Sequence, residues 1–319
     1  MERINNNVQP EHVVDNTDSG VDLLDDKPEF VKKIESFDVH DLKPENIEFM
    51  NSIIQNTFKD HFPVDPELVD QIPSRMNLVS AEEYTRLSED SGVDANLGYY
   101  NKRKDQIFIN AEKHQTPGAL FSTMFHESLH YVGIQSGAGM TGDFCYPFPG
   151  EGAEVDEMIY YLDKGMLTVV EGTTQLITQA YVLDFMGFTE QEQMITYEPE
   201  VQIMGTILGA LPVEECLEAY FNTPMELLRV RIEDAFADDY DPDNPTGLFA
   251  DYVANIGEAT EKIETALESW RENDDPEPVE AVLGDVRHAV GAYITREVEN
   301  GTRVLSDEDK EKLRDYLES

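Results

Sequence analysis

The sequence predicts an α+β fold that is mostly helical, and three observations carry this prediction. Apolar residues recur at the spacing of one helix face in several segments, for example over Ile47–Ile54. Two short runs rich in β-branched and aromatic residues, Gly98–Asn101 and Gln106–Asn110, flank a charged turn and indicate a hairpin. A strongly apolar helical segment follows the second run. We therefore expect a small β-sheet or hairpin that packs on this helix.

The helix after the hairpin has clear start and stop signals. Thr116 has the side chain of an N-cap, and Pro117 suits the first helical position. Gly133 suits the C-terminal stop. The apolar residues of this helix should bury it in the core: Leu120, Phe121, Met124, Phe125 and Leu129.

Composition limits the class of protein. A chain of 319 residues allows one or two domains with an ample core. The net charge is −43, from 66 acidic and 23 basic residues. Nucleic acids and anionic membranes are therefore not expected as partners, because phosphate binding needs basic patches. The acidity is explained either by solubility alone or by a salty environment that screens the repulsion.

Two cysteines, Cys145 and Cys216, form neither a disulfide framework nor a C-x-x-C zinc motif. The first residues lack a basic start followed by an apolar run, and the chain has no apolar stretch long enough to span a membrane. We therefore expect a cytoplasmic protein, with export by a route that needs no signal peptide left open. The sequence contains no indication of oligomeric state.

The chain divides into three predicted regions. Residues 1–28 are polar, acidic and aperiodic and should form a disordered tail. Residues 29–237 should form the main domain, and 238–319 an acidic helical region behind a break rich in Asp and Pro. A loop rich in Gly and Pro follows the apolar helix at 134–150. After this loop we expect helices over about 151–163, 168–186, 198–210, 213–221 and 224–236.

Residues 126–130 read His-Glu-Ser-Leu-His, the pattern H-E-x-x-H. On a helix, residues four apart share a face, so His126 and His130 can reach one metal ion, and Glu127 can contact a water on that ion. The residue frequencies give an expectation of about 0.02 chance matches in such a chain. The alternative is a pair of half-buried structural histidines bonded to carbonyl groups.

A catalytic zinc ion needs a third protein ligand, and the sequence offers three sets of candidates. Ser136 stands where one zinc-protease pattern requires a histidine, and a neutral serine is a poor ligand. Glu151 and Glu154, at 21 and 24 residues after His130, are the second choice. Glu171 is the third candidate, with an apolar pair before it and Gly-Thr after it, and the family resemblance described next favours it.

The Glu171 segment resembles the glutamate helix of gluzincins, the zinc peptidases with two His ligands and one Glu ligand. With the H-E-x-x-H pattern and the hairpin, the resemblance covers roughly residues 98–210 and is nearest to the compact minigluzincins. The chain departs from the family at Gln175, where an acidic residue often orients the first His ligand. A glutamine carbonyl can still accept the imidazole N–H, but it adds no negative charge.

The resemblance implies a zincin-like fold in which His126, His130 and Glu171 hold one Zn²⁺ ion. It implies hydrolysis of peptide or protein substrates, with Glu127 as the general base and an edge strand that pairs with the substrate. Tyr197 is the candidate for a second donor to the oxyanion. Other readings stay open: a catalytically silent zinc-binding regulatory protein, a metal-free helical protein, and a zinc hydrolase of non-peptide amides. The intact Glu127 favours turnover.

Overall fold

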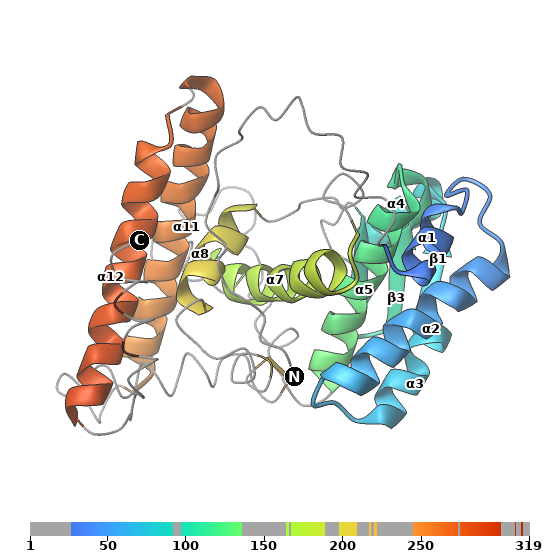
Figure 1. The fold of residues 1–319 in the computed structure, drawn as a ribbon, viewed down its shortest axis with the longest axis horizontal. Coiled ribbons are helices and arrows are strands. Elements are labelled where there is room, and N and C mark those ends of the chain that lie inside the picture. Colours follow the sequence, from blue (N-terminus) through green and yellow to red (C-terminus); the bar gives the residue numbers. More distant parts are fainter. Residues whose placement is uncertain are drawn as a thin grey trace.

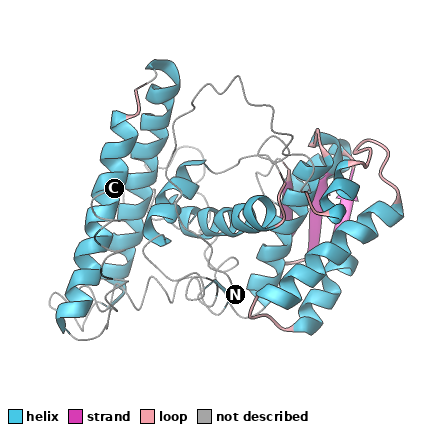
Figure 2. Ribbon diagram, in the orientation of Figure 1, coloured by secondary structure: helices cyan, strands magenta, loops and turns pink. Residues whose placement is uncertain are grey.

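The computed structural model describes residues 27–91, 97–135, 164–165, 167–188, 198–208, 217, 220–221, 245–273, 275–300, 310 and 314. These residues are mostly helical and include one three-stranded sheet (Figures 1 and 2). The expected class, a mostly helical α+β fold, is thus confirmed.

Three helices open the described part of the chain: α1 (Glu29–Glu35), α2 (Pro44–His61) and α3 (Pro66–Arg75). The expected helix over Ile47–Ile54 is the middle of α2, and its Met50 and Ile54 side chains are fully buried. All three helices contribute to one hydrophobic cluster with the sheet and the long apolar helix. The cluster includes the apolar side chains of the helix that carries the two histidines, and thus fixes that helix in the core.

The sheet has the strand order β1-β3-β2, with β1 (Met76–Val79), β2 (Gly98–Asn101) and β3 (Gln106–Asn110). The predicted hairpin is confirmed, since β2 and β3 pair antiparallel around the charged turn. Strand β1 pairs parallel to β3 and was not predicted from the sequence. Strand β2 is therefore an edge strand of this sheet, and β1 is the other edge.

Two helices pack on the sheet. Helix α4 (Ala81–Ser91) covers one face, where Tyr84 packs with Tyr99 and Phe108. Helix α5 (Pro117–Gln135), which carries the two histidines, contacts both β2 and β3. The edge strand and the histidine helix are thus neighbours.

Helix α5 begins as expected but ends later. The Thr116 hydroxyl accepts a hydrogen bond from the Ala119 N–H at 3.1 Å, which confirms the predicted N-cap. Gly133 does not end the helix, which continues to Gln135. Its small size instead admits Tyr220, whose ring would lie 3.3 Å from a Cβ at this position. The predicted apolar face is fully buried: Leu120, Phe121, Met124, Phe125 and Leu129.

The expected helix over 168–186 is present, but two of its segments are wound as π-helix. The order is η3 (Thr168–Gly172), α7 (Thr173–Gln179) and η4 (Ala180–Phe185), of which the first and last are π-helical. Short π-helical turns inside α-helices are frequent at functional sites. Glu171 lies in the first of them.

The described C-terminal residues include α8 (Glu198–Leu208) and the long pair α11 (Pro245–Asn273) and α12 (Glu277–Asn300). In Figure 1 these two long helices lie side by side at the end of the molecule opposite to the sheet, and α8 lies between them and α7. A hydrogen bond of 2.8 Å joins the hydroxyls of Thr168 and Thr260. Helix α11 thus contacts the π-helical turn that bears Glu171.

Several sequence predictions fall wholly or mostly outside the described residues. They are the tail over 1–28, the loop over 134–150, the helices over 151–163 and 224–236, and the break after 237. Of the helix expected over 213–221, the described residues 217, 220 and 221 are helical. No helix in the described ranges is long and apolar enough to cross a membrane.

Candidate metal centre

The three predicted ligands come together at the contact between α5 and the π-helical turn of η3. The Nε2 atoms of His126 and His130 lie 3.1 Å apart. The Oε2 atom of Glu171 lies 3.3 Å from the first of them and 3.2 Å from the second. Residues far apart in sequence therefore point one ligand atom each at a common centre.

The triangle fits a tetrahedral metal ion. With bonds of about 2.0–2.1 Å, two ligand atoms of a tetrahedral zinc site lie about 3.3 Å apart. The observed edges of 3.1–3.3 Å match this separation. Lone pairs at such distances repel one another unless protons or a cation lie between them. Two imidazoles and one carboxylate suit zinc and also other divalent transition ions.

The three side chains of the triad are largely buried. His126 and His130 are 6% and 8% exposed, whereas the Glu171 side chain retains 17% of its accessible surface. Ionisable side chains that are buried to this degree are normally paired with another polar group or bound to a metal ion. Glu171 is thus the most exposed of the three side chains.

Local packing explains the position of Glu171. Its neighbour Gly172 faces α8, and a Cβ there would lie 2.6 Å from the Glu200 carbonyl oxygen. Only glycine allows α8 to approach this closely. Gly172 therefore lets the turn that carries Glu171, the predicted ligand, pack directly against α8. The hydroxyl of Thr174 donates to the Val170 carbonyl at 2.7 Å and strengthens the same turn.

Electrostatics inside the triad favour an ion pair before a metal enters. Burial by itself raises the pKa of Glu171, but the two histidines, His130 foremost, hold that pKa well below its usual range. Burial by itself lowers the pKa of His130, but the Glu171 carboxylate outweighs it and raises this pKa to about 9. A metal ion would therefore replace the His130 proton as the partner of Glu171.

Glu127 lies beside the triad and is only 6% exposed. Burial raises its pKa, and the nearby histidines His130 and His126 offset part of that rise. Its carboxylate accepts a hydrogen bond from the backbone N–H of Tyr100 in β2. The carboxylate is thus held between the histidines and the edge strand.

The direction of the backbone groups of β2 follows from the hairpin pairing. The Asn110 N–H donates to the Leu97 carbonyl at 2.8 Å, so Leu97 faces β3. Backbone groups alternate along an antiparallel strand, so those of Gly98 and Tyr100 face away from β3, toward the outer edge. The Tyr100 N–H that reaches Glu127 agrees with this alternation.

Other predicted residues have different outcomes. Gln175 is 3% exposed, and its Nε2 has no partner among the described residues. Its predicted role in orienting His126 stays a prediction. Tyr181 belongs to the core, as expected. The remaining predicted or weighed residues lie outside the described ranges: Tyr197, Ser136, Glu151, Glu154, Cys145 and Cys216.

Two tyrosines near the site were not predicted from the sequence. Tyr100 was assigned only to a strand, although its N–H contacts Glu127. Tyr220 packs on Gly133, and its hydroxyl lies 2.8 Å from that of Thr174. Burial raises the pKa of Tyr220, and the carboxylates of Glu171 and Glu127 add to this rise. No local motif marks either tyrosine, since both contacts join distant segments.

Comparison of this chain with protein-family models, with curated proteins and with solved structures found no match. The inferences about this site therefore rest on its own residues and geometry.

Proposed function

We propose that this chain is a zinc-dependent hydrolase that cleaves peptide bonds. The convergence of His126, His130 and Glu171 within 3.1–3.3 Å of one another, beside the buried Glu127, carries the proposal. Three protein ligands leave one position of a tetrahedral ion open, which is the usual arrangement of a catalytic zinc site. A purely structural zinc site usually fills all four positions with protein ligands.

When bound, the zinc ion would supply Lewis acidity that activates water and polarises the scissile carbonyl. Glu127 would accept the proton of the attacking water and later deliver it to the leaving amine. The Tyr100 N–H keeps the Glu127 carboxylate at a fixed position for both transfers. Tyr197 stays the proposed second donor to the oxyanion, and Tyr220 is an alternative on the described part of the chain.

The edge of β2 supports an extended peptide as the substrate. The outward backbone groups that Glu127 does not use, the N–H and C=O of Gly98 and the C=O of Tyr100, lie next to the proposed general base, and no strand among the described residues pairs with this edge. A peptide added as a further strand would gain main-chain hydrogen bonds that do not depend on its sequence. Non-peptide amides would lack this contribution.

A catalytically silent zinc-binding protein is the second candidate. Such a protein would need the three ligands but would have no use for Glu127. Here the Glu127 side chain packs against β2, and a Cβ at position 98 would lie only 2.9 Å from its Cγ. Burial of an acid without a role is costly, so this accommodation favours turnover.

The test is cleavage of an unfolded protein by the zinc-loaded wild type and by Glu127→Gln, at low and at molar salt. We expect cleavage by the wild type and a loss of at least about 100-fold in the variant, as for loss of a general base. The control is Glu112→Gln, an exposed glutamate just before α5. Zinc-loaded, folded wild type without cleavage would favour the silent protein, and equal cleavage by Glu127→Gln would refute the assigned base.

A further inference from the structure

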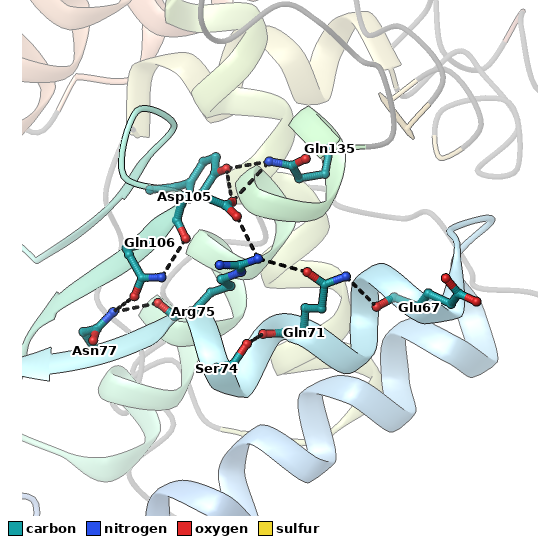
Figure 3. A network of polar contacts seen from close by, with 9 residues as sticks. Glu67, Gln71, Ser74, Arg75, Asn77, Asp105, Gln106 and Gln135 are labelled. Carbon is teal, nitrogen blue, oxygen red and sulfur yellow. Dashed lines mark hydrogen bonds and ion pairs between the residues drawn. The ribbon is translucent and has the colours of Figure 1, made fainter.

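Figure 3 shows a polar network at the end of α5 that includes Arg75, Asp105 and Gln135, and the Tyr100 side chain takes part in it. Its hydroxyl donates to Oδ1 of Asp105 at 2.9 Å and accepts from Nε2 of Gln135 at 2.9 Å. The same Gln135 nitrogen also lies 3.2 Å from Oδ1 of Asp105. Gln135 is the last residue of α5, so this network joins the hairpin to the C-terminal end of the histidine helix.

A third element enters the network through Arg75, the last residue of α3. Its Nη2 pairs with Oδ2 of Asp105 at 2.9 Å and donates to the side chain of Gln71 at 3.1 Å. Arg75 also hydrogen-bonds to Tyr131 of α5. The rings of Tyr131 and Tyr100 meet edge to face at 5.5 Å. The Tyr131 ring therefore packs on the Tyr100 ring, and Arg75 holds the Asp105 carboxylate that the Tyr100 hydroxyl contacts.

Asp105 is placed for this role by an uncommon backbone conformation. Its φ is +52°, which makes it the one described residue other than glycine with a positive φ. Asp and Asn tolerate this region better than most residues, at a modest cost. In this conformation the Asp105 carboxylate meets both the Tyr100 hydroxyl and Arg75.

We infer that Tyr100 is a positioning residue that fixes the edge strand to α5 at two points. Its hydroxyl is tied through Asp105, Gln135 and Arg75, and its backbone N–H then rests on the Glu127 carboxylate. The catalytic part of this inference rests on the proposed function, whereas the structural part does not.

The two contacts of Tyr100 lie about two helical turns apart on α5, at Gln135 and Glu127. A strand fixed at both points can neither slide along α5 nor lift from it without breaking one of them. Displacement of a positioned group by about 1 Å can cost about 100-fold in rate. The network would thus set the distance of both the general base and a strand-paired substrate from the metal.

The test compares Tyr100→Phe with Tyr84→Phe in the zinc-loaded full chain. Tyr84 is the matched control, because it packs on the opposite face of the sheet and its buried hydroxyl has no partner among the described residues. The first readout is backbone hydrogen exchange, followed by mass spectrometry of peptides that cover β2 and α2. We expect Tyr100→Phe to speed exchange in β2 at least about 10-fold, with α2 unchanged, and Tyr84→Phe to change neither.

The second readout is cleavage together with zinc affinity. We expect kcat of Tyr100→Phe to fall about 10-fold, with zinc affinity within about twofold of the wild type. Asp105→Asn keeps an acceptor for the Tyr100 hydroxyl and should retain more activity than Asp105→Ala. Exchange that rises equally in α2 and β2 would make Tyr100 a general stability residue and overturn the inference.

The outcomes separate this inference from the proposed function. Local release of β2 in a protein that cleaves nothing would support the attachment and refute the peptidase. Cleavage by the wild type, with β2 exchange and kcat unchanged in Tyr100→Phe, would support the peptidase and overturn the positioning role.

Discussion

Gly98 of the edge strand and Glu127 of the histidine helix are in contact so close that a single added carbon would disturb it. A Cβ on Gly98 would lie 2.9 Å from Cγ of Glu127, and equally near to side-chain carbons of Ile109 and Thr123. Its backbone is not in the left-handed region, so the constraint is steric. The strand can approach Glu127, the proposed general base, this closely only because Gly98 has no side chain.

Gly98→Ala should move Glu127 without touching a metal ligand. We expect a loss of about 1–3 kcal/mol in the free energy of unfolding, as for other overpacked interiors. Cleavage should fall at least about 10-fold, while zinc affinity stays within a few-fold of the wild type. Urea titration, zinc titration and peptide cleavage measure these three quantities.

The control for this variant is Gly284→Ala in α12, where nothing lies within 4 Å of the added Cβ. This change should be neutral or stabilise by up to about 1 kcal/mol, because alanine is the better helix former. Unchanged cleavage by Gly98→Ala would mean that Glu127 has room to spare, which contradicts the close fit.

Gly172→Ala should act on the metal ion rather than on the base. The added Cβ would meet the Glu200 carbonyl oxygen at 2.6 Å, and a backbone atom in a helix yields less easily than a side chain. The turn that carries Glu171 must then shift. We expect zinc affinity to fall about 10–100-fold, the range typical of disturbed support around a ligand.

Gly205→Ala is the matched control, because its Cβ would make an ordinary contact of 3.5 Å with Leu176 on the same helix pair. Competition with a chromogenic chelator measures the affinity of all three proteins. If Gly172→Ala binds zinc as tightly as Gly205→Ala does, the close crossing of α8 does not position Glu171.

The structural features that were predicted correctly from the sequence depend on local patterns. The start of α5 follows from Thr116 and Pro117, whose roles are decided within one turn. Two histidines four apart must share a helix face wherever that helix packs. The hairpin follows from β-rich runs on either side of a charged turn. In each case, the residues that determine the feature are close in sequence.

The parts that were missed depend on distant partners. The four residues of β1 become a strand only because β3 is beside them. Gly133 looked like a helix stop, since nothing local reveals that Tyr220 packs on it. The two contacts of Tyr100 likewise join a strand to a helix through tertiary packing. The helix and strand propensities of single residues do not predict such contacts, because tertiary packing overrides them.

Removal of the metal should destabilise the protein through the triad alone. Zinc at 100 times its dissociation constant should stabilise the fold by about 2.7 kcal/mol, and a chelator should abolish this gain. Glu171→Gln should remove most of the zinc dependence, because it replaces an anionic ligand by a neutral amide. Glu268→Gln, an exposed glutamate of α11, should retain it.

The same titration decides between the candidate third ligands. If Glu171→Gln keeps its full zinc-dependent stability and Glu151→Gln or Glu154→Gln loses it, Glu171 is not the third ligand. Glu151 or Glu154 would then take that role. Denaturant unfolding at fixed zinc concentrations provides the measurement for each variant.

His114 should make the metal-free protein sensitive to mild acid. Its ring is fully buried, with Nδ1 2.9 Å from the Asn110 carbonyl and Nε2 2.9 Å from the Thr123 hydroxyl. Burial lowers the pKa of His114, and its backbone hydrogen bonds offset this only in part. The unfolded chain, with a histidine pKa of about 6.5, therefore takes up a proton that the folded protein resists.

The sign of the effect follows from this difference. Stability from the neutral ring is fully present above about pH 6.5 and falls as the pH drops, by at most about 1.4 kcal/mol per unit. His114→Gln should be less stable at pH 7, because the glutamine cannot fill both hydrogen-bonding positions, but its stability should fall less between pH 6.5 and 5. Urea unfolding in the presence of a chelator measures the difference, and His40→Gln, which alters an exposed histidine, is the control. A gap between wild type and His114→Gln that stays constant over this range would show that His114 takes up protons equally in the folded and unfolded states.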